Sequence, residues 1–364
     1  MSGAALPEPS FEGRSVALPP VLANLQALRA YAAISVATFH FALVPASSVP
    51  WNYGSFGVDL FFVLSGFIIA WSSRQGQRHF LLNRAIRVLP PYWIVTALGG
   101  LIVLIAMPLG AAIGWIGRSL LFLSGPDGRP PILFVGWTLV YELAFYVIYA
   151  AALRIGRRRA PLVAATALIV IAYGLRPIGI ATRDWPLLVE FVFGLAIATW
   201  SERTQTSARA APPLLIVMAG LALLYASESF VHAQEGAAAD QLRLLVLGLP
   251  AAAVVFGLVQ LERAKVTVRS HAVLAVGAAS YAVYLLHPLV FSFALPFAAG
   301  SPSTRFGIFA TLLAITFGVA LAFHTGVEAP LLRLLRKRLA GTPPSMIEEM
   351  RVSPRREQKP IEGR

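Results

Sequence analysis

The sequence has no cysteine and few charged residues. Asp, Glu, Lys and Arg together make up 13% of the 364 residues, while hydrophobic residues make up 57%. The lack of cysteine excludes a disulfide framework, a thiolate metal site and a cysteine acyl-enzyme. Ordinary soluble domains carry about a quarter charged residues, so a soluble fold of this size would lack the charge to cover its surface. Disorder and coiled coil are excluded for the same reason, and the composition predicts a polytopic membrane protein.

Several common functional motifs are also missing. The chain has no GxxxxGK[ST] phosphate loop, no HExxH zinc motif and no GxSxG nucleophile elbow. Residues 1–20 hold no apolar stretch typical of a signal peptide, so none is expected. The net charge of +13 comes from basic residues that cluster between apolar stretches, which indicates membrane topology before nucleic-acid binding. We therefore predict neither a metal site nor a nucleic-acid partner.

Apolar stretches make up most of the chain. A spanning helix needs about 20 predominantly apolar residues. Residues 112–124 are too short and too interrupted by Gly and Arg, and are expected to form an interfacial or re-entrant piece. The predicted fold class is an all-α polytopic membrane protein with about ten transmembrane helices, at residues 27–45, 54–72, 90–108, 134–154, 160–177, 185–201, 211–228, 241–261, 272–297 and 304–327.

The distribution of Lys and Arg predicts the orientation. Ten spans put both termini on one side, and the loops on that side carry thirteen Lys or Arg against six on the other. The side rich in Lys and Arg is normally cytoplasmic, so both termini are predicted to be cytoplasmic. We expect an N-terminal cytoplasmic segment 1–23, a transmembrane domain 24–332 and a basic tail 333–364, whose last four residues resemble a protease-linker remnant.

Residues 73–89 and 329–340 mix basic and apolar side chains, and each is predicted to form a short amphipathic helix at the cytoplasmic interface. Arg84 and Arg87 lie three residues apart on one face of the first. Their forked donors suit phosphate oxygens. By charge alone, however, ordinary membrane topology is the favoured interpretation of these arginines.

The first predicted span carries Arg29 and His40, eleven residues apart. That separation is about three full helical turns, so both side chains share one face, roughly 16 Å apart along the axis. Such a face offers an anion anchor at its cytoplasmic end and a proton acceptor deeper in. The alternative is an arginine that reaches lipid headgroups and a histidine bound by a neighbouring helix, and the spacing does not choose between them.

Other ionisable residues fall within predicted spans, where a charge costs about 2.5–3.5 kcal/mol and is by default a functional candidate. Asp59 is expected to pair with a cation, a protonated histidine or helix amides. His324 and Glu328 are spaced to face the same way on a helix. For these two and Glu190 we favour a role in tying helices together. The remaining candidates are Glu142 and His287.

Six motifs of this sequence, in their order along the chain, resemble those of the acyltransferase-3 family of membrane O-acyltransferases. The resemblance covers about residues 24–332, with the matches in sequence order, and its exopolysaccharide acetyltransferase branch is the most similar. The matching motifs are Arg29-x10-His40, Gly57-Val58-Asp59-Leu60-Phe61-Phe62, Arg84-x-x-Arg87 before Pro90-Pro91, Trp137-x4-Glu142, Ser280-Tyr281 to His287-Pro288, and Glu328-x-Pro330.

This resemblance implies an acyl-CoA donor, most often acetyl-CoA, on the cytoplasmic side of a bacterial inner membrane, and transfer to a carbohydrate hydroxyl, on an exopolysaccharide or a lipid-linked precursor. Arg29, Arg84 and Arg87 would hold the phosphates of CoA. The expected catalytic residues are His40 as general base and Asp59 or Glu142 as the group that orients its ring. Trp137, Tyr281 and His287 are expected to bind substrate, with His287 as a second-choice base.

Two other classes of protein, a transporter and a non-catalytic scaffold, agree with part of this pattern. A transporter or flippase of a lipid-linked sugar would also need ten spans with buried ionisable groups. It is less favoured because the chain shows no pair of matching interrupted helices, and because an arginine cluster beside a buried histidine has no evident use there. A non-catalytic scaffold leaves the buried charges unexplained. Succinyl or longer acyl groups stay open, as does an acyl-enzyme on Ser, Thr, Tyr or His.

Overall fold

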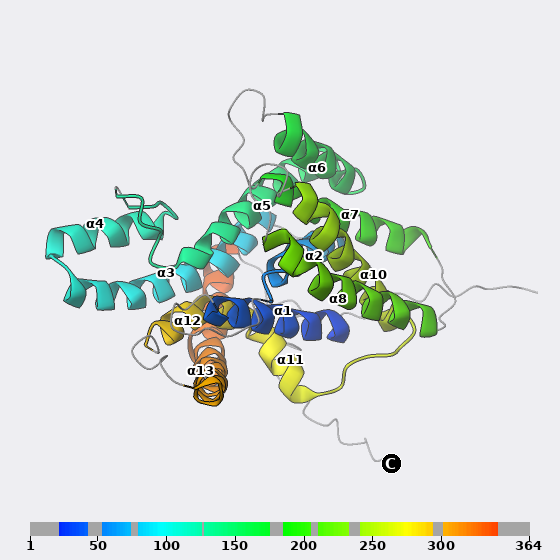
Figure 1. Ribbon diagram of the computed structural model, residues 1–364. Helices are drawn as coiled ribbons and strands as arrows, with labels where there is room; N and C mark the ends of the chain where they lie inside the picture. The colour runs from blue at the N-terminus through cyan, green and yellow to red at the C-terminus, as the bar shows by residue number, and fades with distance from the viewer. Residues whose placement is uncertain are drawn as a thin grey trace, which may run out of the picture.

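The structure, a computed structural model, describes residues 22–42, 53–73, 79–125, 127–174, 185–204, 210–232, 241–293 and 301–340. Regular structure in these ranges is helical throughout, and no strand occurs in them (Figure 1). The all-α prediction is confirmed. The longer helices are α1 (Ala23–Ala42), α2 (Gly57–Ser73), α3 (Phe80–Ala106), α4 (Leu109–Leu120), α5 (Trp137–Ile155), α6 (Ala160–Ile169), α7 (Leu188–Arg203), α8 (Ala211–His232), α10 (Leu249–Arg263), α11 (His271–Ala278), α12 (Ser280–Ser292), α13 (Pro302–Phe323) and α14 (Ala329–Leu335).

Short helical turns extend several of these helices. Two of them matter for the site: η1 (Phe134–Gly136) leads into α5, and η8 (Arg336–Ala340) follows α14. The others are η2 (Val170–Gly174), η4 (Trp185–Leu187), η5 (Leu244–Gly248) and η7 (His324–Glu328).

Five helical stretches in the described residues are long and apolar enough to cross a membrane, and α11 with α12 makes a sixth if that bent pair is counted as one span. Two shorter apolar helices, α2 and residues 160–174, accompany them. This supports the membrane character, while the count of ten spans and the cytoplasmic termini stay predictions. The five stretches are Phe80–Ala106, Phe134–Ile155, Ala211–Val231, Gln241–Arg263 and Ser303–Leu339.

The prediction of separate interfacial helices was wrong where the structure describes them. Residues 80–89 are the beginning of α3, which runs on to Ala106 through Pro90 and Pro91. A proline inside a membrane helix is tolerated when neighbouring groups satisfy the backbone around it. Here the hydroxyl of Tyr281 donates to the carbonyl of Val88, two residues before Pro90, at 2.8 Å. That carbonyl follows those of Ile86 and Arg87, which lose their helical donors to Pro90 and Pro91. Residues 329–340 likewise continue the helix that begins with α13.

Close helix crossings hold the centre of the bundle together. A methyl group added at Gly66 of α2 would lie 2.1 Å from the carbonyl oxygen of Phe191, and one at Gly194 of α7 would lie 2.1 Å from that of Val63. Glycine at both positions lets the two backbones approach, as small residues do in membrane helix pairs. At one edge of the bundle, α4 folds back beside α3 (Figure 1).

The predicted span 272–297 is broken. Its helices α11 and α12 meet at Ala279 and differ in direction by 73°. A methyl group at Gly277, just before the break, would lie 2.1 Å from the carbonyl oxygen of Gln26 on α1. The backbones of α11 and α1 therefore pack closely just before the bend, and α12 leaves it with Tyr284 and His287 buried in the bundle.

Candidate active site

Two histidines meet where the end of α1 approaches α12. Nδ1 of His40 lies 2.8 Å from Nε2 of His287, which is hydrogen-bond distance. Their rings are nearly parallel, with 12° between the planes and 5.0 Å between the centroids. His287 is fully buried, whereas His40 is half-buried. Both were predicted as site residues, but no sequence signal placed them in contact.

Aromatic and hydroxyl side chains enclose the histidine pair. Phe134 of η1 packs edge-on against His40 at 4.9 Å between centroids. The ring of Tyr284 lies 5.9 Å from that of His287, and its hydroxyl donates to the carbonyl of Val135 at 2.8 Å. The hydroxyl of Thr138 lies 2.7 Å from the same tyrosine oxygen. These contacts fix η1 and the start of α5 against α12 around the two histidines.

The segment that brings Phe134 to the pair is anchored to α3 and α4. The hydroxyl of Tyr92 donates to the carbonyl of Ser119 at 2.6 Å, and the hydroxyl of Ser119 accepts from the backbone N–H of Ile132 at 3.0 Å. The ring of Tyr92 also stacks on that of Phe122 at 4.2 Å. Phe122 and Ile132 are therefore held against α3 and α4 on the two sides of this connection.

Glu142, predicted to orient His40, has other hydrogen-bond partners. Its Oε1 accepts from the hydroxyl of Ser65 at 3.0 Å and also from the hydroxyl of Tyr146. In the described part of the chain, no hydrogen bond joins Glu142 to His40. The carboxylate instead connects α5 to the middle of α2.

Arg84 lies beside the same network. Its Nη2 donates to the hydroxyl of Ser72 at 3.0 Å, and its guanidinium lies 5.5 Å from the ring of Phe80 and 6.0 Å from that of Tyr146. Aromatic faces stabilise a cation at these distances. The buried Nε of Arg84 has no hydrogen-bond partner among the described residues.

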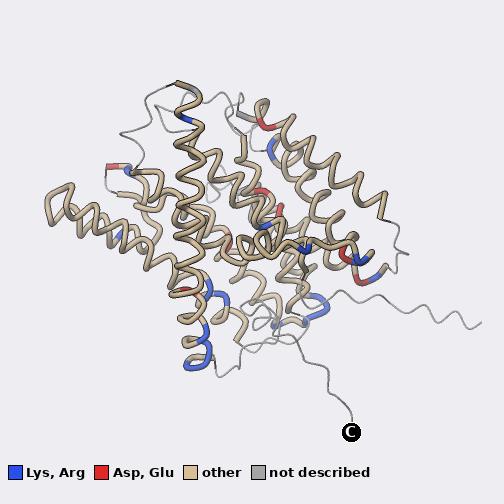
Figure 2. Tube along the Cα trace, turned by 90° about the horizontal axis from the view of Figure 1, so that it is seen from below, with Lys and Arg blue, Asp and Glu red and all other residues tan. Residues whose placement is uncertain are grey.

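Two more arginines approach Arg84. Arg87 lies one turn further along α3, and Arg336 lies in η8, which packs on α3; both repel the guanidinium of Arg84. Arg336 is half-buried, whereas the other basic residues of 333–338 are exposed. Figure 2 shows that Lys and Arg gather toward one end of the molecule. Like charges brought together in this way favour the binding of an anion.

Arg29 and His40 lie on one unbroken helix, as predicted. The helix α1 runs from Ala23 to Ala42 without interruption, so the shared face and the separation of about 16 Å follow from helix geometry. Arg29 is half-buried. One face of α1 thus carries a guanidinium near its start and the histidine pair near its end.

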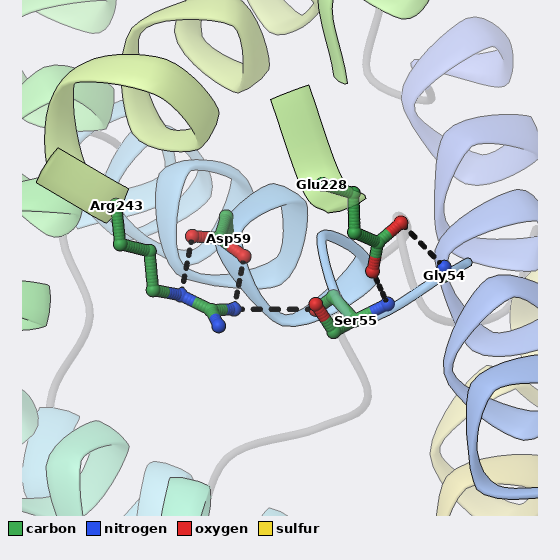
Figure 3. Close-up of polar contacts among 5 residues, drawn as sticks. All are labelled: Gly54, Ser55, Asp59, Glu228 and Arg243. Carbon is green, nitrogen blue, oxygen red and sulfur yellow. Dashed lines mark hydrogen bonds and ion pairs between the residues drawn. The ribbon is translucent and has the colours of Figure 1, made fainter. Parts of the chain in front are cut away.

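Asp59, the other predicted catalytic carboxylate, forms an ion pair (Figure 3). Arg243 donates from Nε to its Oδ1 at 3.1 Å and from Nη2 to its Oδ2 at 2.6 Å. The carboxylate is fully buried, and the side chain of Arg243 is 19% exposed. Of the three kinds of partner expected for Asp59, the structure contains the cation. Among the described residues, no hydrogen bond joins Asp59 to His40.

Glu228 fixes the turn before α2 (Figure 3). Its two carboxylate oxygens accept from the backbone N–H groups of Gly54 at 2.7 Å and Ser55 at 2.5 Å. Arg243 also donates to the carbonyl of Ser55 at 3.4 Å. Sequence reasoning missed Glu228 and Arg243. The sequence did indicate Arg243, because a charged residue stands there at the beginning of an apolar span. It was treated only as one of the six Lys and Arg of the less basic side of the membrane.

The remaining candidates lie around this framework. His324 and Glu328 pair at 2.9 Å in η7, which confirms their predicted contact. Glu190 is fully buried on α7 beside Asp59. Trp137 contacts Tyr141 edge-on at 5.9 Å and is 39% exposed, so part of its ring remains accessible.

Similarity to known proteins covers most of the chain. Residues 22–325 match a family described as an acyltransferase domain. The chain is 32% identical over 310 residues to exopolysaccharide production protein ExoZ of Rhizobium meliloti (strain 1021), covering 78% of this chain and 92% of that protein. It is 24% identical over 376 residues to acyltransferase MdmB of Streptomyces mycarofaciens, covering 89% and 95%. No solved structure matches.

Proposed function

Because the chain belongs to the acyltransferase-3 family, as its motifs predict, we propose that it transfers an acyl group, acetyl in the first instance, from acyl-CoA to a carbohydrate hydroxyl. The similarity to an exopolysaccharide production protein supports an exopolysaccharide, or its lipid-linked precursor, as the acceptor. Similarity to a second protein named as an acyltransferase supports the reaction type.

One observation carries the proposal. His40 and His287 belong to different family motifs, lie 247 positions apart in the chain, and form a hydrogen-bonded pair inside the bundle. Imidazole is the side-chain group whose ordinary pKa lies nearest neutrality, and histidine is the residue most often used as a general base. In the proposed reaction, His40 takes the proton of the acceptor hydroxyl as that oxygen attacks the thioester carbon. The C–O bond of the ester forms, the C–S bond breaks, and the proton passes to the CoA thiolate.

The donor site is proposed at the end where the arginines gather. Arg84, Arg87 and Arg336 would bind CoA phosphates, whose oxygens match the forked donors of guanidinium groups. Arg29 would contribute from the start of α1. A pantetheine arm, on the order of 15–20 Å long, has a reach comparable with the rise of about 16 Å between Arg29 and His40. The excess of Lys and Arg at this end supports a cytoplasmic donor in a bacterial inner membrane.

The two carboxylates then have positioning roles. Glu142 accepts hydrogen bonds from Tyr146 and Ser65 and so holds α5 against α2. It also lies close enough to Arg84 to attract its guanidinium electrostatically. Asp59 holds α2 to the segment that carries Arg243. Trp137 and Tyr281 are proposed to contact the substrates, since both lie on helices that contribute residues to the histidine enclosure.

Calorimetry with acetyl-CoA tests the donor site. The purified protein in lipid nanodiscs should bind acetyl-CoA, and the Arg84→Ala/Arg87→Ala variant should lose most of that binding. The matched control, Arg157→Ala/Arg158→Ala, removes two exposed arginines and should bind as the wild type does. A folded wild type that binds neither acetyl-CoA, succinyl-CoA nor free CoA would contradict the proposal and favour a transporter.

A further inference from the structure

We propose that His287 is the positioning residue that fixes the tautomer of His40, so that the imidazole Nε2 of His40 is the atom that accepts the substrate proton. This inference rests on the proposed acyl transfer. It assigns to His287 the role that sequence reasoning gave to Asp59 or Glu142, and it replaces substrate binding as the role of His287.

The tautomer of His287 follows from its contact with its own helix. Nδ1 of His287 lies 3.2 Å from the carbonyl oxygen of Val283, and a carbonyl can only accept. Nδ1 must therefore carry the proton in the neutral ring. The opposite tautomer would point a lone pair at the carbonyl in a fully buried site, where an unsatisfied polar group costs about 1–3 kcal/mol. The lone pair of the ring is thus on Nε2.

The tautomer of His40 follows from that of His287. Nε2 of His287 faces Nδ1 of His40 at 2.8 Å, and since the first is an acceptor the second must be the donor. A neutral His40 protonated on Nδ1 has its lone pair on Nε2. His40 is also the half-buried member of the pair, so it is the ring that a substrate can approach.

The same contact supports His40 after it gains a proton. The imidazolium keeps its Nδ1–H bond to His287, and that bond becomes charge-assisted and roughly twice as strong. A third group does this in hydrolase triads, where it is a carboxylate. Here the neutral imidazole of His287 accepts the Nδ1–H bond of His40. A neutral partner avoids the cost of a buried anion that would be unpaired while His40 is still neutral.

Packing limits other orientations of the two rings. Phe291 lies 5.8 Å from the ring of His287 and meets it edge-on, and Phe134 meets His40 in the same way. A ring flip of His287 would break its hydrogen bond to the carbonyl of Val283.

Substitution of His287 by two amides of different length gives a sharp test. In His287→Gln, the side-chain oxygen reaches the position of Nε2 and can still accept from His40. In His287→Asn, the same group reaches only the position of Nδ1. We expect the Gln variant to keep kcat within roughly 10-fold, and the Asn and Leu variants to lose about 10²–10⁴-fold. The KM of these three His287 variants for acyl-CoA should equal that of the wild type. The control variant His271→Leu, at an exposed position, should have the kcat and KM of the wild type.

A second measurement does not depend on turnover. Solid-state ¹⁵N NMR of histidine-labelled protein in bilayers distinguishes a ring protonated on Nδ1 from one protonated on Nε2. The wild type should show His40, assigned by its loss in His40→Ala, protonated on Nδ1. His287→Gln should keep that state and His287→Leu should lose it. A wild-type His40 protonated on Nε2, or equal kcat in the Gln, Asn and Leu variants, would overturn the inference. The predicted tautomer in a protein that binds no acyl-CoA would instead overturn the proposed function alone.

Discussion

Replacing Arg243 with methionine should destabilise the protein strongly. Its guanidinium is bound to the fully buried carboxylate of Asp59 by two hydrogen bonds, of 3.1 and 2.6 Å. Removing one partner of a buried ion pair leaves the other charge without compensation, which costs about 3–5 kcal/mol. Thermal unfolding in nanodiscs, followed by tryptophan fluorescence, should show a lower Tm for Arg243→Met. Arg158→Met, at an exposed position between α5 and α6, should show little change.

Removing both charges together should recover most of this loss. Buried ion pairs replaced by apolar residues of similar volume are often neutral or more stable, so Asp59→Leu/Arg243→Met should unfold closer to the wild type than Arg243→Met does. Because the ion pair positions helices and does not touch His40, the double variant should also transfer acyl groups at a rate within roughly 10-fold of the wild type.

Two results would refute this interpretation. An Arg243→Met variant as stable as the wild type would mean that the ion pair contributes nothing to stability. A double variant with wild-type Tm but at least a 10²-fold loss of kcat would mean that Asp59 takes part in the chemistry, as a general acid–base partner would.

Three further predictions concern the donor site and the helix crossing. Arg336→Ala should raise the KM for acyl-CoA about 10-fold, the effect of losing one charge-assisted hydrogen bond, while Arg338→Ala should not; steady-state kinetics distinguishes them. Tyr146→Phe removes a donor from Glu142 and should lower the free energy of unfolding by about 1–3 kcal/mol, measured by denaturant titration. Gly194→Ala should cost about 1–3 kcal/mol, since its methyl group would meet the carbonyl of Val63, whereas Gly318→Ala has open space and should not destabilise.

Contacts within one helix could be predicted from the sequence. The common face of Arg29 and His40 and the pairing of His324 with Glu328 both depend only on the rise and rotation of a helix. The family resemblance, which rests on residue types at fixed spacings, was confirmed by the family match over residues 22–325.

Contacts between distant segments could not be predicted in the same way. The cost of burying Asp59 predicted that it needs a partner, but nothing in the sequence indicated which of several cations lies 184 positions away. The contact of His40 with His287 likewise depends on how α12 leaves its bend beside α1. The bend lies two residues after Gly277, where α11 packs closely against the carbonyl of Gln26, and a lone glycine does not predict that partner.

The beginning of α3 was mispredicted because a change in local composition was taken as the boundary between two helices. Residues 73–89 mix basic and apolar side chains and residues 90–108 are mostly apolar, so an interfacial helix and a span were expected to meet at residue 90. Proline removes a backbone donor, but a helix continues through it when its surroundings satisfy the turn. Tyr281, almost two hundred positions away, donates to the carbonyl of Val88 in this turn. The helix runs on to Ala106, and Arg84 and Arg87 belong to the long helix itself.

Transfer by His40→Ala tests the central proposal most directly. The wild type and the variant, in nanodiscs, would be given radiolabelled acetyl-CoA and the exopolysaccharide or its lipid-linked precursor, with acetyl-CoA affinity measured on the same samples. We expect the variant to bind acetyl-CoA as the wild type does and to lose transfer by about 10²–10⁴-fold. Transfer by His40→Ala at the wild-type rate would contradict the role of His40 as the base.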